Sequence, residues 1–126
     1  MENRYLYRGK RREDREWVEG FLFVVNDVPY ILPYHNTGQP IHVDNLLKTA
    51  IEVLEDTVCQ CTGYEGIYEK DIFQCEDERY VIEWSDYSLS WEAESIFSSE
   101  TISLGEFLPK EIDVIGNVFD NPELLE

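Results

Sequence analysis

Basic residues are scarce in this chain, and their scarcity limits what it can bind. The 126 residues include 27 aspartates and glutamates but only 10 lysines and arginines, which gives a formal net charge of −17. Six of the basic residues fall within residues 1–20 beside five acidic ones, so residues 21–126 carry a net charge of −18. Because affinity for nucleic acids rests on cations that neutralise phosphates, we expect no direct binding of DNA or RNA. Three interpretations of the acidity stay open: binding to basic proteins, mimicry of a nucleic acid's charge, or simple solubility.

Cysteines and long apolar runs are also few. The three cysteines, Cys59, Cys61 and Cys75, are an odd number at spacings that poorly suit a disulfide framework. No apolar stretch approaches the roughly 18 residues that would span a bilayer, and the first residues contain no apolar run of the signal-peptide type. We therefore expect a cytoplasmic protein with reduced thiols that does not bind membranes.

Motifs that carry chemistry are missing as well. The chain has neither a G-x-S-x-G nucleophile elbow nor a Gly-rich phosphate loop, and its two histidines, His35 and His42, fall in or near a proline-bounded loop. The three cysteines offer three thiolates where a structural zinc site needs four ligands, so we interpret them as core residues. The acidic run at 76–78 lacks the spacing of a calcium loop. We predict no catalytic residues, no metal site and no cofactor.

What the chain has in abundance is short runs of β-branched and aromatic residues. Residues 17–25 (WVEGFLFVV) predict a strand, Asn26-Asp27 a turn, and the run before Pro33 an edge strand of the same hairpin. Further short runs separated by acidic or Gly/Ser turns predict a small barrel or sandwich; they cover residues 71–75, 79–84, 89–96 and 112–119. The fold class is therefore mainly β.

Three further segments give weaker signals. Residues 44–56 fit either a short helix begun by Asp44 or a strand at 51–54, a turn at 55–56 and a strand at 57–61. Alternating aromatic and basic residues around Tyr7 fit a short strand. Pro122 suits the first position of a short helical end.

Two of the tryptophans allow two structural interpretations. Trp84 and Trp91 both fall in predicted strands, where they either fill the core or form an exposed recognition patch. We favour core packing, since large aromatic side chains are mostly buried.

Three segments together resemble the YopX family of phage and prophage proteins. They are YRGKR with EWVEGFL at 7–11 and 16–22, TVCQCTG with IYEKDIF at 57–63 and 67–73, and VIGNVFDNPELL at 114–125. The chain departs from the family in two places: the loop after Gly63 is short, and Lys70 stands where a glycine is common.

The resemblance implies a single YopX-like domain over residues 1–126, with an N-terminal β-hairpin region and a C-terminal SH3-like barrel of short antiparallel strands at about 57–120. It implies a phage or prophage origin, hence the cytoplasm of the bacterial host, and it makes a homo-oligomer plausible. It brings no established activity and no catalytic residue.

We expect the motif residues to have structural roles. We expect the glycines to permit positive φ or close backbone approach, the asparagines to bond turn backbone groups, Asp71 to pin the entry of a strand, and tryptophans such as Trp17 and Trp84 to fill the core. The predicted structural motif comprises Trp17, Gly20, Thr62, Gly63, Asp71, Gly116, Asn117, Asn121 and Pro122.

The sequence thus favours an accessory protein of unknown activity that acts by protein–protein contacts and self-assembly, with an unknown protein partner. The alternative is an acidic mimic that blocks a nucleic-acid-binding protein, and an enzyme is the least favoured class. The basic start of the chain could meet the acidic body of a neighbouring subunit, which would make the charge asymmetry a feature of assembly.

Overall fold

The structure, a computed structural model, describes residues 5–33 and 49–126 of the chain. Its internal contacts divide into two compact units, Met1–Gly63 and Tyr64–Glu126. The single domain expected over residues 1–126 stays a prediction beside this division. His35, His42 and the first part of the ambiguous segment, residues 44–48, lie outside the described residues.

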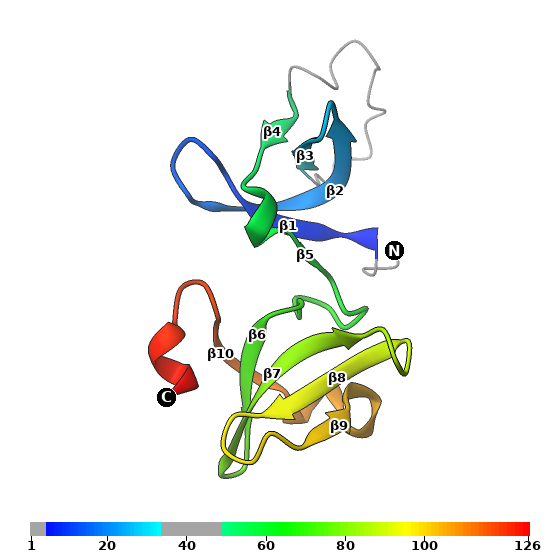
Figure 1. Ribbon diagram of the computed structural model, residues 1–126, viewed down its shortest axis with the longest axis vertical. Coiled ribbons are helices and arrows are strands. Elements are labelled where there is room, and N and C mark those ends of the chain that lie inside the picture. Colours follow the sequence, from blue (N-terminus) through cyan, green and yellow to red (C-terminus); the bar gives the residue numbers. More distant parts are fainter. Residues whose placement is uncertain (1–4, 34–48) are drawn as a thin grey trace. The chain divides into compact units, whose positions relative to one another are not determined.

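The first unit is an antiparallel five-stranded sheet with the strand order β4-β3-β2-β1-β5 (Figure 1). β2 (Trp17–Val25) and β3 (Val28–Pro33) form its long hairpin, and β1 (Tyr7–Lys10) pairs with β2. Two short strands, β4 (Ile51–Glu52) and β5 (Cys59–Gln60), complete the sheet at its edges.

The hairpin has the predicted turn. Asn26 and Asp27 have φ values of +52° and +65°, and positive φ at both central residues is the type I′ geometry that matches strand twist. The predicted edge position of β3 is wrong, because β4 pairs with it at Ile31. The carbonyl oxygen of Pro29 accepts a hydrogen bond from the Val53 N–H just beyond β4, at 3.2 Å.

A threonine joins β1 to the segment that the sequence left ambiguous. Thr57 ends a single 3-10 turn, η2 (Glu55–Thr57). Its Oγ1 accepts the Lys10 N–H at 2.9 Å and donates to the Leu54 carbonyl at 2.6 Å. In the described part of this segment the structure is therefore strand, turn and strand, with no long helix. The buried residues of the unit include Leu6, Ile31, Leu32, Val53, Cys59 and Cys61.

The second unit is also an antiparallel five-stranded sheet, with the order β10-β6-β7-β8-β9 (Figure 1). Its strands are β6 (Asp71–Cys75), β7 (Glu78–Ser85), β8 (Ser90–Ser95), β9 (Thr101–Ser103) and β10 (Asp113–Asn117). Three 3-10 turns follow β9 and β10: η3 (Leu104–Glu106), η4 (Pro109–Glu111) and η5 (Pro122–Leu125).

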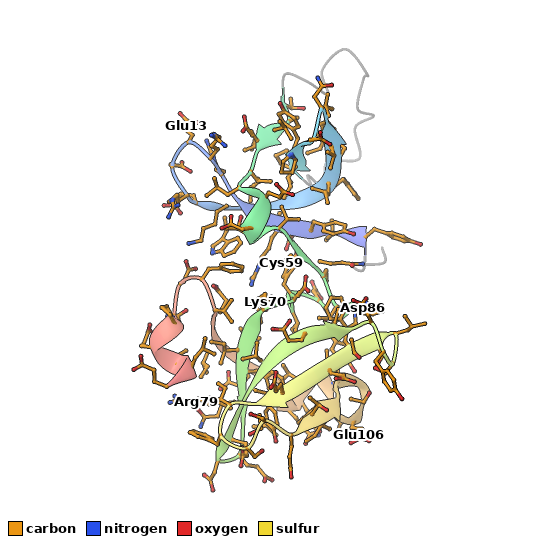
Figure 2. All side chains as sticks on the ribbon, in the orientation of Figure 1. Glu13, Cys59, Lys70, Arg79, Asp86 and Glu106 are labelled. Atoms are coloured by element: carbon orange, nitrogen blue, oxygen red, sulfur yellow. The ribbon has the colours of Figure 1, made fainter. Side chains whose placement is uncertain are left out.

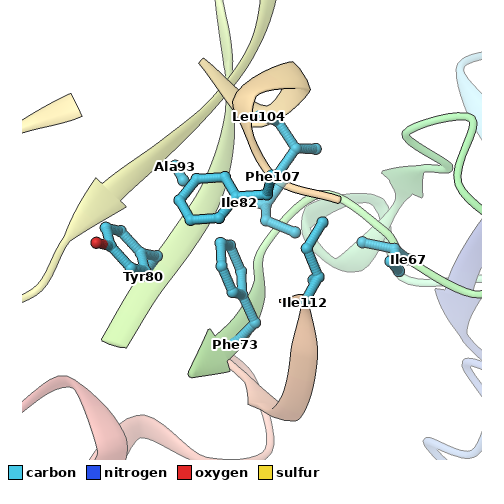
Figure 3. Close-up of a cluster of buried hydrophobic side chains, with 8 residues drawn as sticks. All are labelled: Ile67, Phe73, Tyr80, Ile82, Ala93, Leu104, Phe107 and Ile112. Atoms are coloured by element: carbon cyan, nitrogen blue, oxygen red, sulfur yellow. The ribbon is translucent and has the colours of Figure 1, made fainter. Parts of the chain in front are cut away.

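Three aromatic rings lie at the centre of the second unit (Figure 3). Phe73 stacks on Tyr80 with ring centroids 5.2 Å apart, and the Phe107 ring meets them edge-on at 5.2 Å and 5.4 Å. Such pairs contribute about 0.5–1.5 kcal/mol each beyond the area they bury. The whole cluster is Ile67, Phe73, Tyr80, Ile82, Ala93, Leu104, Phe107 and Ile112.

Two ionisable groups in and beside this core are held neutral. Burial raises the pKa of the Tyr80 hydroxyl, and nearby carboxylates, Glu78 foremost, raise it further. Burial likewise raises the pKa of the Cys75 thiol, with added repulsion from Glu111 and Glu76. Since the thiolate is the nucleophile, Cys75 is poorly reactive at neutral pH.

The mainly β fold class is confirmed. β2 and β6 have the bounds that the sequence predicted, and β7, β8 and β10 lie within two residues of theirs. The predicted helical end is η5, with Pro122 in its first turn. In the described second unit the edge strands β9 and β10 do not pair with each other, so the SH3-like barrel is an open sheet and not a closed cylinder. In the described residues no helix combines the length and the apolar character that crossing a membrane requires.

Gly20 of β2 lies between Tyr7 of β1 and Pro33 of β3 in the sheet. A Cβ atom added there would overlap the Leu32 carbonyl group and lie 2.9 Å from the Cα of Pro33. We predict that Gly20→Ala lowers the free energy of unfolding by at least about 2 kcal/mol, because backbone atoms cannot move aside as a flexible side chain can. Chemical denaturation followed by circular dichroism measures this.

Gly105→Ala is the matched control. The nearest atom to its added Cβ is the Ser103 Oγ at 3.8 Å, an ordinary contact distance, so its free energy of unfolding should change by less than about 0.5 kcal/mol. Equal effects of the two substitutions would contradict the close approach at Gly20.

Candidate functional site

The β7–β8 hairpin carries two tryptophans beyond the end of the core. Trp84 lies directly opposite Trp91 in the ladder, two residues further along from the Ile82–Ala93 pair. Because side chains alternate across a strand, all four lie on the same face of the sheet. The two indole rings meet edge to face, with centroids 5.2 Å apart and an interplanar angle of 74°.

The two rings differ in exposure. Trp91 is half-buried and packs against the core cluster, whereas Trp84 is 42% exposed. The expectation that Trp84 fills the core is therefore wrong. The core ends at the Ile82–Ala93 pair, and the next pair along the face extends into solvent.

The hairpin tip next to this pair presents two more large side chains to solvent. Tyr87 is fully exposed and Leu89 is 71% exposed. Leu89 also has a φ of +53°, a left-handed conformation that is unusual for a bulky residue. Backbone strain of this kind persists only where the surroundings hold it, and it is concentrated at functional positions.

Side-chain hydrogen bonds hold the tip in this shape. The Ser85 Oγ accepts the Ser88 N–H at 3.1 Å, and the Ser88 hydroxyl donates to a Glu92 carboxylate oxygen at 2.9 Å. The Trp84 indole N–H donates to the Asp86 Oδ1 at 3.1 Å, which fixes the ring beside a carboxylate. We call the set Trp84, Asp86, Tyr87, Leu89 and Trp91 the hairpin-tip surface.

Charge is very unevenly divided between the two units. Residues 64–126 hold 17 carboxylates and three basic groups, a net charge of −14, while residues 1–63 hold ten carboxylates and seven basic groups, a net charge of −3. On the face of β7–β8 opposite the tryptophans, Glu83 lies directly across from Glu92. Like charges in this position destabilise a sheet.

Lys70 offsets part of that repulsion. Its Nζ lies 2.8 Å and 2.7 Å from the two carboxylate oxygens of Glu83. The backbone of Lys70 has a φ of +71°, the region that favours glycine, and glycine is the residue expected at this position from the family resemblance. The lysine thus occupies a strained position and makes an ion pair from it.

Asp71 lies beside this turn. Its side chain is buried, its Oδ2 accepts the Tyr68 N–H at 2.8 Å, and its own N–H donates to the Tyr68 carbonyl at 3.1 Å. These reciprocal bonds close the turn that begins β6. They support our proposal that Asp71 pins the entry of β6.

Gly116 and Asn117, the last two residues of β10, come together with Asn121 at the end of the strand. The Asn117 Oδ1 accepts the N–H groups of Phe119 and Asp120 at 3.0 Å and 2.9 Å, and the Asn121 Oδ1 accepts the Asn117 N–H at 3.2 Å. A Cβ atom on Gly116 would overlap the Asn121 amide. The Asn121 side chain therefore fits only against a glycine, and it closes the loop that leads into η5.

Three further motif residues, Trp17, Thr62 and Gly63, are in or next to the first unit's strands, and Pro122 begins η5 of the second unit. Trp17 starts β2 and is half-buried, with the Arg8 guanidinium 4.6 Å and the Lys10 Nζ 5.3 Å from its ring centroid. Thr62 is half-buried, and Gly63, the last residue of the unit, has a φ of +105°. A structural role for all nine motif residues is our proposal, supported by these contacts.

Cys59 and Cys61 are both buried in the first unit. The Cys59 thiol donates to the Thr57 carbonyl at 3.3 Å, a local bond typical of a thiol that packs as a small apolar side chain. Among the described residues no three histidine, cysteine or acidic side chains are grouped closely enough to hold a metal ion.

A shallow apolar groove lies between the β2–β3 hairpin and the η2 region of the first unit. Its volume is about 270 Å³, at the lower limit for sites of small ligands. Its lining consists of Leu22, Val24, Asp27, Pro29, Glu55 and Val58.

Sequence reasoning missed Tyr87 and Leu89. Tyr87 falls between the predicted strands at 79–84 and 89–96, whereas Leu89 is the first residue of the second predicted strand and lies in the turn before β8 in the structure. The sequence signal that could have found them is a large apolar residue on either side of Ser88. Turns favour small polar residues, so large apolar side chains placed there are free to contact a partner.

The profile of the family described as YopX protein matches residues 6–126, nearly the whole chain. The chain therefore belongs to the YopX family. A search of curated proteins found no match.

The strain at Lys70 leads to a prediction about stability. Lys70→Ala removes the ion pair and keeps a Cβ at φ +71°, whereas Lys70→Gly removes both the pair and the strain. We expect Lys70→Gly to be more stable than Lys70→Ala by about 1 kcal/mol. It should lie close to the wild type, because a partly exposed ion pair contributes only about 0–1 kcal/mol. Urea denaturation measures the ranking, and equal stability of the two variants would contradict it.

Proposed function

We propose that this YopX-family member is a phage- or prophage-encoded accessory protein that acts by binding another protein in the cytoplasm of the bacterial host. The observation that carries the proposal is the hairpin-tip surface, which presents Trp84, Tyr87 and Leu89 to solvent on a hydrogen-bonded turn. Tryptophan and tyrosine dominate the energetic centres of protein interfaces. The proposal assigns no reaction and no cofactor to the chain.

Rigidity supports this assignment. Side chains that are already held in place lose less conformational entropy when a partner binds, so the free energy of association is more favourable. The Trp84 ring is fixed by Trp91 on one side and by its N–H bond to Asp86. The serine hydrogen bonds hold the Leu89 backbone at positive φ, and in this turn the Leu89 side chain is 71% exposed.

The second candidate is an acidic mimic of a nucleic acid. Its support is the net charge of −14 over residues 64–126 and the presence of Glu83, Glu92 and Glu94 on one face of β7–β8. Many of the other carboxylates of the unit are in turns. We rank this candidate second because one member of the trio, Glu83, is already paired with Lys70.

Affinity capture from host cells that carry the phage or prophage tests the main proposal. The variant Tyr87→Ser/Leu89→Asn removes the apolar tip and keeps a residue at position 89 that tolerates the left-handed conformation. We predict that it loses a co-purifying protein that the wild type retains.

Phe97→Ser is the control for that capture, because Phe97 is 64% exposed in the turn at the opposite end of β8. It should retain the partner. Equal recovery with the tip variant would contradict the proposal, and release of the partner by duplex DNA would favour the acidic mimic.

Self-assembly is a separate part of the proposal, and its support is the contrast between residues 1–20, which hold six basic groups and a net charge of +1, and residues 21–126, with a net charge of −18. We predict a homo-oligomer whose mass, measured by size-exclusion chromatography with light scattering, decreases as salt rises, because attraction between exposed charges is screened. A monomer at high protein concentration would contradict assembly. An oligomer insensitive to salt would contradict its electrostatic origin.

A further inference from the structure

We propose that the hairpin-tip surface binds a cationic side chain, arginine or lysine, of a basic partner segment, with the Trp84 ring as its platform and Asp86 as its counter-ion. This inference rests on the proposed function and specifies the chemistry of the partner. Four observations carry it: the geometry of the tryptophan pair, the position of Asp86, the environment of Trp17, and the distribution of charge in the second unit.

The tryptophan pair has the form of a partial aromatic cage. The two rings are inclined at 74° with centroids 5.2 Å apart, so the pair presents two ring surfaces at a steep angle. Trp91 packs against the core and anchors the pair, while Trp84 is 42% exposed. The faces of indole rings carry negative potential and attract cations within about 6 Å of the centroid.

Asp86 adds a full negative charge at the edge of the same ring. Its Oδ1 accepts the Trp84 indole N–H at 3.1 Å. The carboxylate has a second oxygen, and a carboxylate accepts several hydrogen bonds at once. A guanidinium stacked on Trp84 would therefore find an acceptor beside the platform, which favours a cation over a neutral apolar group.

The first unit of this chain already uses the same interaction. Arg8 and Lys10 lie over the Trp17 ring at 4.6 Å and 5.3 Å from its centroid. Among the described residues no contact of this kind is present at Trp84. The cation for Trp84 is therefore expected to come from a partner.

The second unit has few cations to offer. Its three basic residues are Lys70, Arg79 and Lys110. Lys70 is bound to both oxygens of Glu83. Arg79 and Asp86 lie at opposite ends of the β7–β8 hairpin (Figure 2). With a net charge of −14 the unit attracts positively charged segments over a distance and repels anionic ones.

The rest of the surface defines what flanks the cation. Tyr87 and Leu89 are fully and 71% exposed, so an apolar residue next to the arginine or lysine would contact them. The occupant with the best fit is a short basic segment of a protein with an apolar residue among its cations.

Titration with a synthetic peptide tests this. The probe is acetyl-Gly-Arg-Leu-Arg-Gly-amide, and its matched control carries citrulline in place of both arginines, which keeps the shape and removes the charge. The readout is the indole N–H resonance of each tryptophan in ¹H–¹⁵N spectra of the full chain. We expect the arginine peptide to shift the Trp84 and Trp91 signals and to leave Trp17 unchanged.

Three variants distinguish the contributions of the Trp84 ring, the Asp86 charge and the overall charge of the unit to peptide binding. Trp84→Leu removes the π face and keeps an apolar side chain. Asp86→Asn removes one charge and keeps an acceptor for the indole N–H. Asp77→Asn removes the same charge in the exposed turn between β6 and β7. We expect the first two to weaken peptide binding about three- to tenfold, and Asp77→Asn to change it by less than about 1.5-fold.

Three outcomes would overturn the proposed cation site. Binding of the citrulline peptide as tight as that of the arginine peptide would overturn the cationic preference. Equal loss in Asp77→Asn and Asp86→Asn would show attraction to overall charge and overturn the local site. If the peptide fails to shift Trp84 while the Tyr87→Ser/Leu89→Asn variant still loses its captured partner, the cation site is wrong and the protein-binding function stands.

Discussion

The register between β7 and β8 determines what the second unit buries and what it exposes. Ile82 lies opposite Ala93 in the fully buried centre of the sheet, and Trp84 lies opposite Trp91 one pair further along the same face. Because side chains alternate in a strand, a slip of one residue would turn Glu83 toward the core face of the sheet and would break the Trp84–Trp91 pairing. Burying an unpaired carboxylate is costly, so the core enforces the register, and the register places the tryptophan pair.

The two units have different balances of charge. In the first unit, basic side chains contact carboxylates and aromatic rings of the same unit. Arg12 lies 3.5 Å from the Glu52 carboxylate, and Arg8 lies over the Trp17 ring. The second has 17 carboxylates and three basic groups. Its acidity is a property of the turns and of one sheet face, while its interior is apolar and aromatic. Trp84 is an exposed aromatic side chain on this strongly acidic unit. A basic partner would therefore be attracted there both by the ring and by the negative charge around it.

Several positions hold backbone conformations that side chains disfavour. Lys70 and Leu89 both have positive φ. At Lys70 the Glu83 ion pair and the bonds of Asp71 to Tyr68 account for the conformation. At Leu89 the serine hydrogen bonds hold the turn, and the leucine side chain is 71% exposed. The two positions therefore differ in what surrounds their side chains, which is an ion pair at Lys70 and solvent at Leu89.

The sequence predicts the sheets well and the exposed surface poorly. Alternation and turn residues located β2 and β6 fully because both are continuous β-rich runs. β9 was missed because its three residues are too few to show a period, and the core residues Leu104 and Phe107 lie in turns that carry no strand pattern. The position of Trp84 could not be predicted, because a tryptophan at the end of a strand looks the same in sequence whether the core reaches it or stops one pair before it.

The central claim is that the β7–β8 register leaves Trp84 exposed beside Trp91. The most direct measurement is the pattern of cross-strand nuclear Overhauser effects in the full chain in solution, combined with the exposure of each indole to a soluble paramagnetic agent. The account predicts contacts between Trp84 and Trp91 and between Ile82 and Ala93, with Trp84 more strongly relaxed by the agent than Trp91. Contacts shifted by one residue, or a Trp84 ring as protected as Trp91, would contradict it.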